Sequence, residues 1–180
     1  TRVSEKLSDP SNGAVKYYTQ DYITEEMIGD IRGMWTFGEG TMLEDVSVQT
    51  NDLTATSITT ADLVSGVRGT GILFDGANDK LSRTSDSDFS FGTGNFSASL
   101  WLKSTSATNP AAAEIPLSIV TTTSAADRFR PDFGTDGYLN LSMSTDSGST
   151  SDNINLTTDL YDAQWHYLVM QKNNANWELW

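Results

Sequence analysis

The strongest constraint on the fold is a strict alternation of residue types in Phe96–Lys103. Apolar side chains fill every second position, and polar side chains together with Trp101 fill the positions between them. A period of two is the pattern of a β-strand that buries one of its faces. Other short strand-like segments lie along the chain, separated by turns rich in Gly, Asn, Asp and Ser; among them are Met34–Phe37, Arg128–Phe133 and Tyr138–Met143. The sequence therefore predicts an all-β chain that forms an antiparallel two-sheet sandwich.

The composition agrees with many strands joined by polar loops. Ser and Thr number 44 of the 180 residues, and Asp outnumbers Glu by 17 to 7. Thr favours strands, whereas Ser and Asp favour turns and caps. The chain contains no Cys, which excludes disulfides, thiolate metal sites and cysteine nucleophiles.

The net charge of the chain restricts the classes of partner that it can bind. The formal net charge is −13, and such a surface repels phosphate groups. We therefore expect no binding to nucleic acid or to anionic membrane surfaces. Because no apolar run is long enough to cross a bilayer, we also expect no membrane insertion.

The first 32 residues differ from the rest of the chain. Residues 1–20 are polar without a sustained period, which indicates an extended arm. A short helix is expected over about residues 24–32, because Ile23, Met27 and Ile31 recur every four residues. The predicted organisation is an arm with a short helix over 1–32, followed by a sandwich domain over 33–180. We expect the apolar stripe of the helix to dock onto a neighbouring surface.

Five blocks of sequence carry a family resemblance. They are Gly33–Gly40, Val67–Lys80, Phe91–Lys103, Asp162–Val169 and Trp177–Trp180. In this order they resemble the strand motifs of laminin G-like domains, which belong to the concanavalin A-like jelly-roll superfamily. The resemblance implies a jelly-roll sandwich. It leaves the function open, because this fold serves adhesion, sugar binding, enzyme accessory roles and scaffolding.

The resemblance also implies further strands after Trp180, so the domain is expected to lack its last strands. Three explanations stay open: the sequence is a shortened version, a second chain carries the rest, or a neighbouring subunit donates the missing strand. In each case the last strand has an open edge. Trp177 and Trp180 in this strand are therefore candidate assembly residues, together with the helix stripe.

The sequence shows no catalytic constellation. The resemblance to concanavalin A-like glycosidases would imply a Glu-x-Asp-x-x-Glu strand, whose carboxylates share one face, and the sequence contains no such motif. His166 is the only histidine and lies in a strongly apolar segment. We expect it to be a hydrogen-bonded structural residue, and we expect the protein not to be an enzyme.

Calcium is the cofactor that the sequence suggests most directly, since it prefers oxygen ligands from carboxylates, amides and carbonyls. The loop Glu44–Asp52 resembles a family loop that often holds a structural calcium ion, with Asp45 and Asn51 as the candidate ligands. Asp75 and Asp79 border a second turn and are further candidates. The alternative at both places is an Asp- and Asn-rich turn without a ligand.

Trp101 is the candidate for ligand binding, because it stands on the otherwise polar face of its strand. An exposed aromatic ring on a sheet can stack on a pyranose ring. The alternative is that Trp101 packs under a loop or a second layer.

Two functions remain after these exclusions. The first is a non-catalytic extracellular structural or adhesive module, a subunit of a surface filament, fibre or virion that self-assembles or binds other subunits through its arm and its open last strand. The alternative is a carbohydrate-binding accessory domain, with or without calcium. Both place the protein outside the cell, on a cell surface or on a virion surface.

Overall fold

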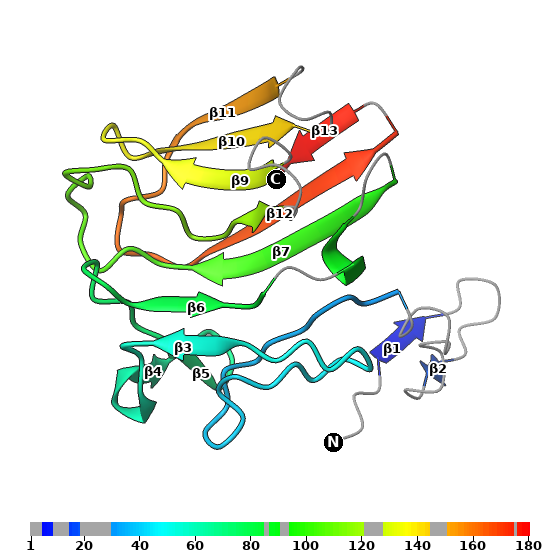
Figure 1. The fold of residues 1–180 in the computed structure, drawn as a ribbon. Helices are drawn as coiled ribbons and strands as arrows, with labels where there is room; N and C mark the ends of the chain where they lie inside the picture. The colour runs from blue at the N-terminus through cyan, green and yellow to red at the C-terminus, as the bar shows by residue number, and fades with distance from the viewer. Residues whose placement is uncertain are drawn as a thin grey trace. The chain divides into compact units, whose positions relative to one another are not determined.

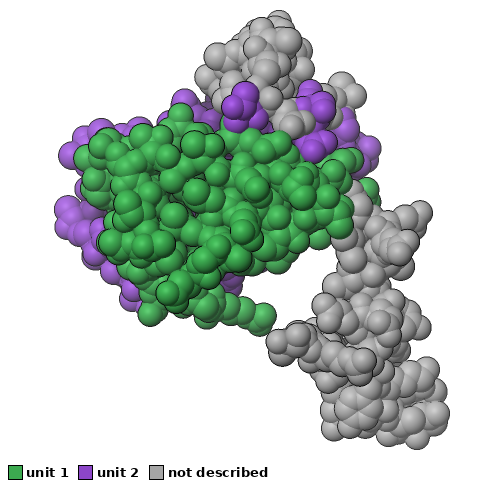
Figure 2. All heavy atoms as spheres, turned by 60° about the horizontal axis from the view of Figure 1, so that its bottom comes forward, with its two compact units in different colours: residues 1–83 green, residues 84–180 purple. Residues whose placement is uncertain are grey.

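A computed structural model describes residues 5–8, 15–18, 30–84, 87–90, 94–120, 128–144, 151–174 and 176–180. These residues form thirteen strands and two short 3₁₀ turns (Figure 1). Every strand pair is antiparallel, so the prediction of an all-β chain with antiparallel sheets is confirmed. The chain divides into two compact units, residues 1–83 and 84–180, which Figure 2 colours separately. The domain boundary expected after residue 32 stays a prediction.

The first unit is built from three two-stranded sheets. Its pairs are β1 (Glu5–Ser8) with β2 (Val15–Tyr18), β3 (Thr54–Thr56) with β6 (Lys80–Ser82), and β4 (Leu63–Ser65) with β5 (Thr70–Ile72). A 3₁₀ turn, Thr60–Asp62, precedes β4. Its first residue is capped by Thr59, whose side chain accepts the N–H of Ala61 at 3.2 Å. The region expected to be an extended arm thus contains the paired strands β1 and β2.

Two predictions for the first unit concern a strand over Met34–Phe37 and a helix over about residues 24–32. Met34–Phe37 was expected to be a strand, but the structure assigns no strand there. Phe37 has a φ of 52°, which lies outside the extended region and interrupts a strand at that residue. The helix expected over about 24–32 falls mostly outside the described residues, as do Ile23 and Met27. Its last residues, 30–32, are a turn and irregular backbone, and Ile31 is exposed.

The second unit contains two larger sheets (Figure 1). One has the order β13-β12-β7, from Asn176–Leu179, His166–Asn173 and Phe96–Leu102. The other has the order β11-β10-β9-β8, from Ser151–Asp159, Tyr138–Ser144, Arg128–Phe133 and Ile119–Val120. A second 3₁₀ turn, Ser87–Phe89, precedes β7.

An apolar core joins the two sheets of the second unit. Leu139 and Leu141 of β10 are fully buried and share this core with Leu168 and Met170 of β12. Leu100 of β7 packs against both halves of the core. Burying one such side chain contributes about 1.5–3 kcal/mol. The alternation predicted for Phe96–Lys103 is confirmed, since exposure alternates residue by residue along β7.

Candidate functional site

The outward side of the three-stranded sheet carries exposed aromatic side chains, and packing in the core does not account for them. Inward positions of β7 and β12 supply the core, so the positions between them point outward. The strand register places these outward residues in one surface, which we call the aromatic face. Its members are Ser97, Ser99, Trp101, Tyr167, Val169, Gln171, Asn173, Asn176, Glu178 and Trp180.

Trp101 and Tyr167 form one end of the aromatic face. They are direct partners in the β7–β12 register, with ring centroids 5.0 Å apart and planes tilted by 35°. Both side chains are accessible, because Trp101 and Tyr167 are each 50% exposed. The prediction that Trp101 stands outward on its strand is confirmed, and the alternative of packing beneath a loop or second layer does not hold for this residue.

A third aromatic side chain lies on the same face. Trp180 is 69% exposed, and its backbone exchanges two hydrogen bonds with Val169, at 3.0 and 2.9 Å. Trp177 was grouped with Trp180 as a candidate assembly residue, but the two point to opposite sides. Trp177 packs inward against the core, next to Phe96 and Phe129.

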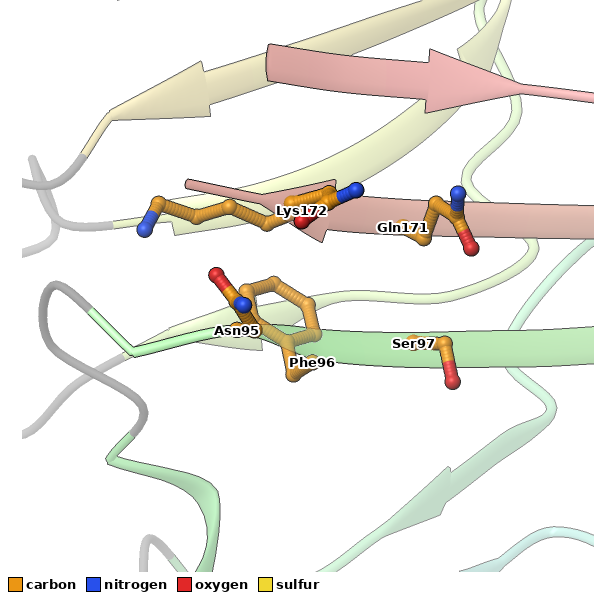
Figure 3. Close-up of a pocket in the computed structure, with 6 residues that line it drawn as sticks. Asn95, Phe96, Ser97, Gln171 and Lys172 are labelled. Carbon is orange, nitrogen blue, oxygen red and sulfur yellow. The ribbon is translucent and has the colours of Figure 1, made fainter. Parts of the chain in front are cut away.

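A shallow hollow of about 310 Å³ lies farther along β7 and β12 (Figure 3). It is lined by Asn95, Phe96, Ser97, Gln171, Lys172 and Asn173. Ser97 and Gln171 are register partners on neighbouring strands, as Figure 3 shows, and both belong to the aromatic face. Asn173 also belongs to this face, whereas Phe96 and Lys172 are inward positions of the same strands, so the hollow adjoins the aromatic face at the end away from the aromatic pair.

Hydrogen bonds hold the polar groups around the hollow in place. Gln171 donates its side-chain N–H to Glu178, and Asn95 Oδ1 accepts the backbone N–H of Asn174 at 2.7 Å. Lys172 is turned inward, where its Nζ donates to the carbonyl of Gly94 at 3.1 Å and lies 5.8 Å from the Trp177 ring. The hollow thus presents amide and hydroxyl groups, while its nearby ammonium group is used internally.

The aromatic face combines flat apolar rings with donors and acceptors of hydrogen bonds. Tyr and Trp suit such surfaces, since each ring has an apolar body and a polar edge. Exposed aromatic groups that are rimmed by polar side chains are typical of interaction sites. This face can stack a flat ligand at Trp101 and Tyr167 and hydrogen-bond it near Gln171.

Asp45, a candidate calcium ligand, is buried in a loop of the first unit. Its Oδ1 accepts the N–H groups of Met34 and Ser47 at 2.7 and 2.9 Å, and its Oδ2 accepts the Ser47 hydroxyl and the Asn51 N–H at 2.7 and 2.8 Å. Burial favours a raised pKa, but these hydrogen bonds outweigh it and hold the pKa of the Asp45 carboxyl below its ordinary value. Asp45 therefore acts as a clip that fixes the loop backbone.

Asn51, the second candidate in this loop, is also buried. Its side-chain Nδ2 donates to the backbone carbonyl of Arg32 at 2.7 Å, and its backbone carbonyl accepts the indole N–H of Trp35 at 3.1 Å. Asn51 and Asp45 together connect the chain around Met34 to the loop that ends at Asp52. The structure brings these two candidates together, as the sequence predicted.

Asp75 and Asp79 organise a separate turn. Asp75 Oδ1 accepts the N–H groups of Ala77, Asn78 and Asp79 at 2.8, 3.2 and 3.4 Å, and Asp79 Oδ2 accepts the N–H of Asp75 at 2.8 Å. These contacts are those of an Asp-rich turn. Within the described part of the chain, no three Asp, Glu or His side chains gather in a metal-binding arrangement. A calcium site at either turn stays a prediction.

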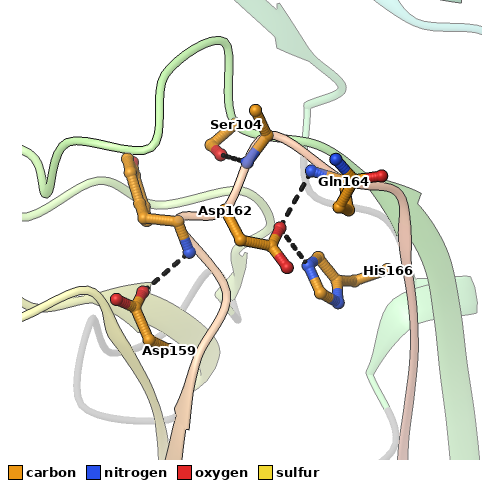
Figure 4. Close-up of polar contacts among 7 residues, drawn as sticks. Ser104, Asp159, Asp162, Gln164 and His166 are labelled. Atoms are coloured by element: carbon orange, nitrogen blue, oxygen red, sulfur yellow. Dashed lines mark hydrogen bonds and ion pairs between the residues drawn. The ribbon is translucent and has the colours of Figure 1, made fainter.

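His166 is hydrogen-bonded at the start of β12, as expected. Its Nε2 lies 2.8 Å from Asp162 Oδ1, and the same oxygen accepts the N–H of Gln164 at 2.8 Å (Figure 4). The hydrogen bond from His166, followed by that from Gln164, lowers the pKa of the Asp162 carboxyl. The pair fixes the turn that leads into β12 and so helps to place Tyr167.

Trp101 was among the site residues predicted from the sequence, whereas Tyr167 was not. The signal was available: Tyr167 alternates with the buried Leu168 and Met170, just as Trp101 alternates with Leu100. What the sequence lacked was the pairing of the two strands. Only their register places the two rings side by side.

No protein-family model, no curated protein and no solved structure matches this chain. Among the described residues, no helix is long and apolar enough to cross a membrane. The site therefore has to be interpreted from its own geometry.

Proposed function

We propose that the chain is a non-catalytic adhesive module that binds carbohydrate through the aromatic face. The observation that carries this proposal is the half-exposed pair of Trp101 and Tyr167 on outward strand positions, where most of the other side chains are polar. Because both side chains are half-exposed, the pair forgoes part of the roughly 1.5–3 kcal/mol that full burial of a large apolar side chain contributes. One face of a pyranose ring presents C–H groups, and these match the negative face of an aromatic ring.

The charge and polarity of the face support carbohydrate over the other ligand classes. The whole chain carries a net charge of −13, which opposes nucleic acids and anionic membranes. The face carries one carboxylate, Glu178, and this group is hydrogen-bonded to Gln171. Glycoside hydrolysis uses two carboxyl groups across the scissile bond. We therefore propose binding without catalysis.

The proposal includes the fold type and the location of the protein. Two antiparallel sheets with a shared core in the second unit, and the five sequence blocks in order, support a laminin G-like jelly-roll sandwich. An adhesive module that recognises glycans works at an extracellular surface, on a cell or a virion.

The experiment that tests this function compares two proteins on a panel of insoluble polysaccharides. Wild-type protein should be depleted from solution by at least one of cellulose, chitin, xylan, mannan or starch. The double variant Trp101→Ala/Tyr167→Ala should stay in solution. Tyr138→Ala removes an exposed tyrosine from the other sheet and serves as the control, with wild-type binding expected. Binding that survives in the double variant contradicts the proposal.

A second function, as a structural subunit of a surface assembly, is favoured by the first unit. Ile58 is the one hydrophobic side chain that is buried among the described residues of this unit. Several apolar side chains there are at least 42% exposed: Met34, Val46, Val48, Val67, Leu73 and Phe74. A unit with so little buried apolar surface gains stability by packing on a neighbour. Light scattering after size-exclusion chromatography should then show an oligomer, and a monomer at high concentration contradicts this role.

A further inference from the structure

We propose that the glycan bound by the aromatic face is a neutral chain of several sugar units, which extends from the Trp101–Tyr167 pair to the hollow beside Gln171. This inference rests on the proposed function, because it specifies the ligand of that same face. In this arrangement one sugar ring stacks on the aromatic pair, and a further sugar unit of the same chain occupies the hollow as a second subsite.

The two ends of the face are aligned by the strand register. Trp101 pairs with Tyr167, and four residues earlier on β7 Ser97 pairs with Gln171. With a rise of about 3.3 Å per residue, the two pairs lie about 13 Å apart along the strands. That span is longer than one pyranose ring, which is about as wide as the ring of Tyr167. A ligand that uses both ends must therefore be an oligosaccharide.

The middle of the face leaves a path for such a chain. Between the aromatic pair and the hollow, the outward positions are Ser99 on β7 and Val169 on β12. Ser99 is exposed and small, and Val169 is half-buried. Neither side chain is long enough to stand between the two ends, so the surface runs continuously from rings to amides.

The hollow is chemically suited to sugar hydroxyl groups, which both donate and accept hydrogen bonds. Gln171 uses one side-chain N–H on Glu178, and an amide has a second N–H and a carbonyl oxygen in addition. The Asn95 side chain is oriented in the same way by its bond from Asn174. Groups that are already fixed lose little freedom when a ligand binds, which favours affinity.

The charge of the second unit selects neutral chains over acidic ones. Residues 84–180 contain four Lys and Arg against eleven Asp and Glu. At the hollow, Lys172 is directed to Gly94, and the group nearest to Gln171 is the Glu178 carboxylate. Lys103 is exposed just after the aromatic end of β7, but it is one cation within a unit of net negative charge. A carboxylate or sulfate on every sugar would be repelled along most of the face.

The test is a calorimetric titration of the full chain with length series of neutral oligosaccharides. Cello-, xylo-, manno-, chito- and malto-oligosaccharides run from the monosaccharide to the hexasaccharide, and oligogalacturonides of the same lengths form the acidic arm. The hexasaccharide of at least one neutral series should bind roughly tenfold more tightly than its disaccharide. The oligogalacturonides should bind at least tenfold more weakly than that series.

Two variants separate the subsites. Gln171→Ala should remove the gain on lengthening and leave the disaccharide affinity unchanged, whereas Asn155→Ala, an exposed amide on β11, should behave as wild type. Circular dichroism and the unfolding midpoint establish that both variants are folded. Length-independent binding that still requires Trp101, or preference for oligogalacturonides, overturns this inference and leaves the proposed function standing. Absence of binding in every series overturns both.

Discussion

Trp101 and Tyr167 face each other across β7 and β12, with their ring centroids 5.0 Å apart and both rings open to solvent. As a cross-strand pair, the two rings stabilise the folded state. Their exposure to water, 50% for each residue, forgoes part of the stability that burial would add. A pair that served stability alone would gain more on the inward side of the same strands, where Leu100 and Leu168 lie.

The first prediction is that the two rings are energetically coupled. A double-mutant cycle with Trp101→Ala and Tyr167→Ala should give a coupling of about 0.5–1.5 kcal/mol in the free energy of unfolding. Urea denaturation of the four proteins measures it. The same cycle with Tyr138→Ala in place of Tyr167→Ala should give additive effects, since Tyr138 lies in the other sheet. Additivity for Trp101 and Tyr167 contradicts the stacked pair.

A second prediction concerns Tyr161, which is buried in the core of the second unit and donates its hydroxyl to the Glu114 carboxylate. Tyr161→Phe removes this donor and keeps the ring. The loss should lower the free energy of unfolding by about 1 kcal/mol, since the exposed Glu114 recovers water as a partner. Tyr138→Phe, on an exposed tyrosine, should be neutral in the same assay.

The same residue gives a prediction for alkaline pH. Burial, followed by the hydrogen bond and the charge of Glu114, raises the pKa of Tyr161 above the ordinary tyrosine value of 10.0. The folded state therefore holds this proton more tightly than the unfolded state. Its contribution to stability is complete below pH 10.0 and is lost as the pH rises further. Urea unfolding on both sides of that pH should show a smaller alkaline loss for Tyr161→Phe than for wild type, and equal losses contradict the assignment.

The strands of the second unit were predictable because each has one face in the core. Arg128–Phe133 and Tyr138–Met143 were expected as strands and are β9 and most of β10. Alternation or short apolar runs bounded by turns were sufficient signals there. The described residues of the first unit form no such core, and its strands are only three or four residues long. Local pattern therefore carried less information in that part of the chain.

Only part of the candidate site could be predicted from the sequence, and the reason differs from that for the first unit. Alternation identified Trp101 as outward, since this follows from one strand alone. Its partnership with Tyr167 and the hollow at Gln171 depend on pairing between segments more than sixty residues apart. The contact of Tyr161 with Glu114 likewise spans 47 residues. Such relationships are set by the tertiary fold and leave no periodic trace in the sequence.

A further prediction tests the clip at Asp45. Asp45→Asn replaces one carboxylate oxygen by an NH₂ group, which cannot accept hydrogen bonds. With the amide oxygen in the place of Oδ1, which Met34 and Ser47 use, the Asn51 N–H loses its acceptor. The Asn51 amide proton should exchange with solvent faster, by about tenfold or more, as expected for the loss of about 1–3 kcal/mol of hydrogen bonding. Hydrogen exchange followed by NMR measures it, and Glu44→Gln at the exposed neighbouring residue is the matched control.

The protonation of Asp45 should have a similar effect. The folded pKa of this carboxyl lies below its ordinary value of 3.8. Its stabilising contribution is therefore present above that value and is lost as the pH falls through the lower, folded pKa. The protection factor of the Asn51 amide, which is the intrinsic exchange rate divided by the observed rate at the same pH, should fall on acidification in wild type and change less in Asp45→Asn. Unchanged protection in both proteins contradicts the clip.

The last prediction concerns calcium. A carboxylate has about four lone-pair positions, and Asp45 already accepts four hydrogen bonds, two on each oxygen. A calcium ion at this loop would have to displace several of these donors, and the gain in coordination would be offset by their loss. Asp75 also accepts hydrogen bonds from its own turn, with three backbone N–H groups directed to its Oδ1. We therefore expect the unfolding temperature and the glycan affinity to be the same in millimolar CaCl₂ and in EDTA. A rise in unfolding temperature with calcium that Asp45→Asn abolishes would instead establish a calcium site at this loop, and a loss of glycan affinity in EDTA would link that ion to the aromatic face.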